Sequence, residues 1–90
     1  MENIKFAFDE LDLLMAKVAR VHGDNHPELN DIKGCYENIK KAYEENNVDI
    51  IKDELKKVDE LSNNLTLPSD ACQAYTRVYK AFGILEEQYK

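Results

Sequence analysis

Apolar residues recur at alternating spacings of three and four along four segments of the chain. That spacing places apolar side chains on one face of a helix and leaves the opposite face polar. The pattern predicts four amphipathic helices, over residues of about 2–22, 26–45, 48–62 and 70–89. Their apolar faces are formed by Ile4, Phe8, Leu11, Leu14, Met15, Val18 and Val21, by Leu29, Ile32, Tyr36, Ile39 and Tyr43, by Val48, Ile51, Leu55 and Val58, and by Ala71, Tyr75, Val78, Phe82, Leu85 and Tyr89.

Residues that commonly start or stop helices stand between these segments. We expect Gly23 to end the first helix in a left-handed conformation. We expect Asn25 to cap the second helix, with Glu28 three residues later as in a capping box. Asn47 and Ser69 take the equivalent place before the third and fourth helices. The connections are short, so neighbouring helices should run antiparallel.

The composition favours one helical domain. A chain of 90 residues is enough for a single domain, and 33% charged residues with three glycines and two prolines are typical of long helices. The sequence therefore predicts an all-α fold over residues 1–90, an up-down-up-down antiparallel four-helix bundle. Gly34 and Gly83 fall inside the predicted helices, where glycine is unfavourable. We expect a neighbouring backbone to approach them closely, or else a tolerant surface.

Charge and cysteine content limit the classes of partner. The formal net charge is −6 and no basic run occurs, so nucleic acid and anionic lipid are not expected partners. No signal-like leader and no apolar run of about 20 residues is apparent, so we expect a cytoplasmic protein without a membrane span. Cys35 and Cys72 lie on different predicted helices, which favours reduced thiols over a disulfide.

The two histidines carry most of the candidate chemistry. In the predicted topology, the end of the first helix lies near the starts of the second and fourth helices and the end of the third. Side chains expected at this pole are His22, His26, Glu28, Glu60, Asp70 and Cys72. Nitrogen, oxygen and sulfur donors of this kind can bind iron or zinc. We assign His22, with His26 and Glu28, as candidate metal ligands.

An ordinary structural role is the competing interpretation of each histidine. The dipole of the first helix and a neighbouring carboxylate would stabilise an inward His22 without any metal. His26 is typical of a polar turn residue, because Gly23 breaks the helix that would otherwise place it on the same face as His22. The spacing alone leaves both interpretations open.

The remaining polar residues indicate little chemistry. The acidic residues of the third helix alternate with lysines, which is typical of a solvated face, and the tyrosines lie at helical spacing, as packing residues do. No nucleophile and base can be paired from the sequence. We therefore do not expect an enzyme. These acidic and aromatic side chains are Asp53, Glu54, Asp59, Glu60, Tyr36, Tyr43, Tyr75, Tyr79 and Tyr89.

Two runs of the chain resemble the Ric-type iron-sulfur cluster repair di-iron proteins, which are hemerythrin-like bundles. The first run, residues 16–32, is AKVARVHGDNHPELNDI, and the second, residues 62–90, is SNNLTLPSDACQAYTRVYKAFGILEEQYK. His22 matches a position at which the family has an iron ligand. No counterpart is present for the family's helix with a His and a Glu ligand, for a histidine near Val48, or for a final His and Glu. The resemblance implies a shortened relative that lacks most of the ligands, so a single chain should not hold a di-iron centre.

These observations lead to three hypotheses about function. The first is a metal-poor binding or assembly module in iron-sulfur or stress response, with no firm cofactor. The second is an iron-binding repair protein whose site, with His22, His26 and Glu28, is completed by oligomerisation or a partner chain. The third is a purely structural bundle that self-associates through an aromatic patch.

Overall fold

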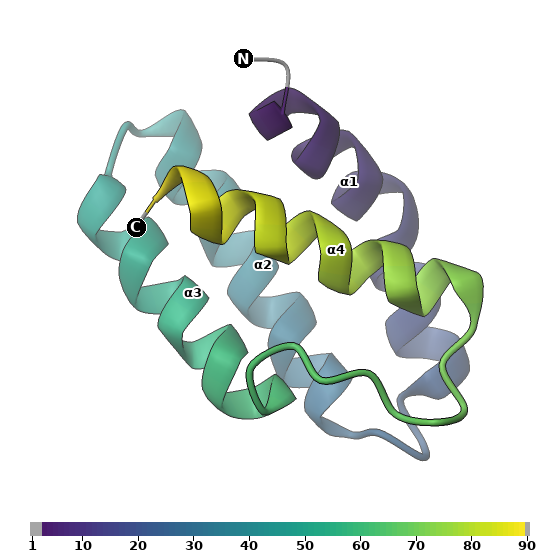
Figure 1. Ribbon diagram of the computed structural model, residues 1–90. Helices are drawn as coiled ribbons and strands as arrows, with labels where there is room; N and C mark the ends of the chain where they lie inside the picture. The colour runs from purple at the N-terminus through teal and green to yellow at the C-terminus, as the bar shows by residue number, and fades with distance from the viewer. Residues whose placement is uncertain (1–2, 90) are drawn as a thin grey trace.

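The computed structural model describes residues 3–89, which form four helices joined by short connections (Figure 1). The helices are α1 (Asn3–His22), α2 (Glu28–Glu44), α3 (Val48–Ser62) and α4 (Gln73–Gln88). No strand occurs in this part of the chain. The all-α prediction is therefore confirmed, and each helix arises from the three-four alternation of apolar residues.

The helices pack chiefly as two pairs. α2 lies against α3 and α1 lies against α4, whereas α3 and α4 have the least extensive contact. The loop between α3 and α4 returns past the connection between α1 and α2, at the lower edge of Figure 1. This loop brings the start of α4 to the same end of the molecule as the end of α1.

The core follows the predicted apolar faces closely. Its largest fully buried side chains are Tyr75, Phe82, Leu11, Met15, Leu29, Ile32, Ile39, Ile51, Leu85, Val18, Val58 and Val78. Three residues of the predicted faces are exposed instead, namely Val21 (61%), Tyr43 (43%) and Val48 (45%). All three lie in the first or last turn of a helix, where fewer neighbours remain to cover a side chain. Tyr43 still contacts Phe8, with ring centroids 4.6 Å apart.

Gly23 follows the end of α1 as predicted, but it does not adopt the left-handed conformation that we expected there. Glycine with positive φ is absent from the described residues; the left-handed positions are Asn46, Asn63, Asn64 and Leu65. A Cβ atom on Gly23 would instead collide with the Ala19 carbonyl oxygen. Glycine is therefore required by close packing at the end of α1 rather than by a left-handed turn.

Two predicted helix starts also need correction. α2 begins at Glu28, its N-cap residue is Pro27, and no side chain caps it, so the predicted capping by Asn25 was wrong. The turn before α2 is formed instead by backbone hydrogen bonds, such as that from His26 N–H to the His22 carbonyl (2.8 Å). α4 begins at Gln73, so Ser69 is not its cap. Ser69 lies instead in a turn that is closed by the hydrogen bond from Ala71 N–H to the Pro68 carbonyl (3.1 Å).

The third start agrees with the sequence. The Asn47 side chain accepts a hydrogen bond from Ile50 N–H at 3.3 Å, as a cap of α3 should. Of the two interpretations of the glycines inside helices, the tolerant surface agrees with the structure, because a Cβ on Gly34 or Gly83 would meet nothing within 4 Å. The close approach of a neighbouring backbone is absent at both positions.

Candidate functional site

Five of the six expected donors gather at one end of the molecule, which we call the histidine pole: His22, His26, Glu28, Asp70 and Cys72. The end of α1 supplies the first histidine, the turn before α2 supplies the second, and the loop before α4 supplies the aspartate and the cysteine. Glu60 is not part of this group. It lines the groove between α2 and α3, because it lies on the exposed side of the last turns of α3.

His22 pairs with Cys72 across the two helices. His22 Nε2 and Cys72 Sγ are 3.3 Å apart, and the sulfur also accepts from Tyr75 N–H at 3.5 Å. Cys72 is the N-cap of α4 and is exposed, while both cysteines of the chain are free. This contact is a nucleophile beside a base, a pair that the linear sequence did not reveal.

His26 pairs with carboxylates instead. Its Nε2 lies 3.0 Å from Asp70 Oδ1, and its Nδ1 lies 3.6 Å from Glu28 Oε2. The hydrogen bond with His26 is the main reason that the pKa of Asp70 lies below its ordinary value. His26 therefore links the start of α2 to the loop before α4.

Tyr75 lies beneath both imidazole rings of the histidine pole and contacts each of them. The His22 and His26 rings both meet it edge-on, with centroid distances of 5.2 and 5.8 Å. Tyr75 is fully buried, and burial is the main reason that its pKa is raised. One core side chain thus holds the two imidazoles near each other, which is a positional role consistent with the packing predicted for the tyrosines.

The donors of the histidine pole do not form the ligand set of a di-iron centre. Among residues 3–89, no three His, Cys, Asp or Glu side chains group together so that they could hold a metal ion. Two separate sets of contacts are found instead, one between His22 and Cys72 and the other between His26 and the carboxylates of Asp70 and Glu28. A zinc or iron site within one chain needs at least three protein ligands. Metal binding by His22, His26 and Glu28 stays a prediction.

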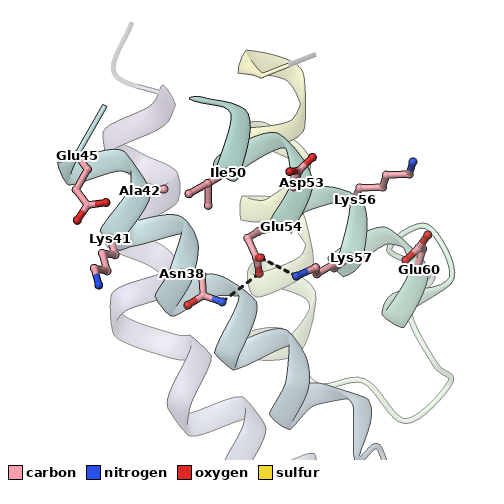
Figure 2. Close-up of a pocket in the computed structure, with 10 residues that line it drawn as sticks. All are labelled: Asn38, Lys41, Ala42, Glu45, Ile50, Asp53, Glu54, Lys56, Lys57 and Glu60. Atoms are coloured by element: carbon pink, nitrogen blue, oxygen red, sulfur yellow. Dashed lines mark hydrogen bonds and ion pairs between the residues drawn. The ribbon is translucent and has the colours of Figure 1, made fainter. Parts of the chain in front are cut away.

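A second polar cluster lies between α2 and α3 and centres on Glu54 (Figure 2). Its carboxylate accepts from Asn38 Nδ2 at 3.3 Å and from Lys57 Nζ at 2.9 Å. Glu54 is only 7% exposed, so the prediction of a solvated residue was wrong. The apolar positions Ile51, Leu55 and Val58 explain this, because position 54 lies on the edge of the same helical face.

The electrostatics of this Glu54 cluster are those of a structural network. Burial raises the pKa of Glu54, but hydrogen bonds from Lys57, Asn38 and Cys35 together outweigh it, and the net shift is downward. Burial, followed by the Glu54 carboxylate, raises the pKa of Cys35 to about 11. The carboxylate therefore stays charged and the thiol stays protonated near neutral pH.

The groove outside this cluster is open and mixed in charge. Figure 2 shows Glu54 directed toward Asn38 and Lys57, with the charged side chains of both helices around it. The lining residues are Asn38, Lys41, Ala42, Glu45, Ile50, Asp53, Glu54, Lys56, Lys57 and Glu60. Acidic and basic groups alternate along it, so no single ligand charge is selected.

A carboxyl pair joins α3 to α4. Glu86 is partly buried, and burial together with a hydrogen bond to Asp59 raises its pKa to about 8. Two carboxyl groups that share a hydrogen bond cannot both be ionised without repulsion. The linear sequence does not indicate this pair, because the two carboxyl groups meet only where α3 packs against α4.

No match to this chain was found among protein-family models, curated proteins or solved structures. Function must therefore be inferred from the residues of the chain. Across residues 3–89, each helix is too short or too polar to cross a bilayer.

Proposed function

We propose that the chain is a helical binding or assembly module, with the up-down-up-down arrangement of hemerythrin-like bundles, that acts in iron-sulfur cluster repair or stress response without a di-iron centre of its own. The resemblance of residues 16–32 and 62–90 to the Ric-type proteins supports the biological setting. The outer face of α1 supports the binding role.

The observation that carries this proposal is the exposure of three large apolar side chains on α1. Leu13 is 66% exposed, Val21 is 61% exposed and Phe6 is 53% exposed. Phe6 and Leu13 are two turns apart on the same side of the helix, so they lie about 10 Å from each other. Aromatic and aliphatic side chains of this kind are the usual anchors of helix-mediated contacts.

Sedimentation equilibrium tests the association directly. We expect the wild-type chain to form dimers at high concentration, and we expect Leu13→Glu to remain monomeric. Val48→Glu is the matched control, because Val48 is a 45% exposed apolar residue on α3. A wild-type monomer at every concentration, or equal loss of association in both variants, would contradict self-association through α1.

The alternative is an iron-binding repair protein whose site is completed by a second chain. The gathering of two imidazoles, a thiol and two carboxylates at one end of the molecule supports it, since these donors of one chain, as described, do not complete a metal site by themselves. This hypothesis predicts association that requires ferrous iron under anaerobic conditions. The association should disappear in His22→Ala and persist in Leu13→Glu, which is the opposite of the first proposal.

A further inference from the structure

The two cysteines lie in opposite surroundings. Cys35 is buried on α2 and its pKa is raised to about 11, first by burial and then by Glu54. Cys72 is exposed at the start of α4. Because the thiolate is the reactive form of cysteine, the surroundings of Cys35 suppress its chemistry. Cys72 is therefore the cysteine of this chain that lies open to solvent.

His22 places a proton acceptor beside Cys72. The imidazole Nε2 is 3.3 Å from the sulfur, although the two residues are 50 positions apart in the sequence. A base within hydrogen-bond reach is what activates a cysteine nucleophile. The ring is oriented by its edge contact with the fully buried Tyr75. The base is therefore held on α1 while the nucleophile stands on α4.

The start of α4 donates a backbone hydrogen bond to the same sulfur. α4 has 16 residues, no acidic residue in its first turn, and a Tyr75 N–H that donates to Cys72 Sγ. Unpaired N–H groups at the start of a helix stabilise an anion there. The Asp70 carboxylate, two residues before the cysteine, forms a hydrogen bond with His26. The His22 imidazole and the first turn of α4 thus both contact one exposed sulfur.

We propose that Cys72 is a reactive thiol that exchanges with small disulfides, with His22 as its proton acceptor. The thiol proton passes to His22 Nε2, and the Cys72 sulfur attacks one sulfur of the disulfide. A new S–S bond forms as the old S–S bond breaks, and the departing thiolate takes the proton from His22. The products are a mixed disulfide on Cys72 and one free small thiol, and excess thiol reverses the reaction. This inference is independent of the proposed association.

The test is the rate of mixed-disulfide formation when the reduced wild-type chain reacts with hydroxyethyl disulfide, a neutral probe, at pH 7. Each cysteine is followed by mass spectrometry of its own peptide. We expect native Cys72 to react about fivefold faster than the same cysteine in chain unfolded with urea, whereas native Cys35 should react far more slowly than unfolded Cys35. A faster rate in the folded chain cannot result from exposure, because unfolding exposes both thiols fully.

Histidine variants identify the acceptor. His22→Gln should lower the native Cys72 rate by about fivefold, and His26→Gln, at the same pole but paired with Asp70, should leave it unchanged. Equal rates in His22→Gln and wild type would overturn the role of His22. A native Cys72 rate at or below the unfolded rate would overturn the whole proposal, and this measurement needs no variant to fold.

Discussion

The histidine pole and the Glu54 cluster contain similar functional groups in opposite settings. At the pole, the exposed Cys72 thiol lies beside the part-buried His22 imidazole, and the part-buried His26 imidazole lies beside two carboxylates. Between α2 and α3, the buried Glu54 carboxylate accepts hydrogen bonds from Asn38, from Lys57 and from the buried Cys35 thiol. The comparison shows that burial and completed hydrogen bonds, rather than residue type, separate a structural polar group from a chemically available one.

The largest expected effect tests the helix faces on which both regions depend. Leu11→Ala should lower the free energy of unfolding by about 2–5 kcal/mol, because Leu11 is 1% exposed and its truncation leaves a cavity. Leu13→Ala, the same change two residues later at a 66% exposed position, should cost no more than about 0.5 kcal/mol. Urea unfolding monitored by circular dichroism measures both. Similar costs would show that the inner face of α1 is misassigned.

The next effect tests whether the Glu54 cluster is structural. Glu54→Ala should cost about 1–3 kcal/mol, because it leaves Cys35 and Asn38 without their acceptor. Glu60→Ala, at an exposed position on the same helix and groove, should be within about 0.5 kcal/mol of wild type.

The pH dependence of this cost has a definite sign. The pKa of Glu54 is lowered from 4.5 in the folded chain, so the contribution of its charge is fully present above that value and is lost as the pH falls through the folded pKa. Chemical unfolding of wild type and Glu54→Ala at neutral and acidic pH checks this. An equal difference at both would show that the charge of Glu54 is not involved.

A smaller effect of opposite sign is expected at Glu86. Its pKa is raised from 4.5 to about 8, so the folded chain holds a proton that the unfolded chain has released, and stability falls as the pH rises between these values. Glu86→Gln should therefore be more stable than wild type by about 1–2 kcal/mol at pH 8, after allowance for solvent contact. At about pH 4 the two proteins should be equally stable. A constant difference in thermal unfolding at both pH values would rule out the shared proton.

The smallest effects concern the glycines. Gly34→Ala and Gly83→Ala should each raise the free energy of unfolding by about 0.5–1 kcal/mol, because both lie in helices with open space at the Cβ position. Gly23→Ala should be destabilising, since its Cβ would collide with the Ala19 carbonyl at the edge of the histidine pole. Thermal unfolding ranks the three variants, and a stabilising Gly23→Ala would contradict the packing described for the end of α1.

The sequence predicted the helices better than the contacts between them. The three-four alternation locates the buried faces because helix geometry is local, and the Asn47 cap could be predicted from neighbouring residues alone. The starts of α2 and α4 could not, since backbone turns at Pro27 and Pro68 determine them. The contact between His22 and Cys72, and that between Asp59 and Glu86, each joins distant segments. The burial of Glu54, by contrast, could have been predicted from local sequence, because Glu54 lies beside Leu55 on the apolar face of α3.

The most direct measurement is the iron content of the wild-type chain after anaerobic reconstitution with ferrous iron and removal of unbound metal. We expect well below one iron per chain, because among the described residues no three donors group together so that they could hold a metal ion. His22→Ala, with its fold verified by circular dichroism, should give the same low value. Two irons per wild-type monomer, lost in His22→Ala, would contradict the central claim that one chain does not hold a di-iron centre.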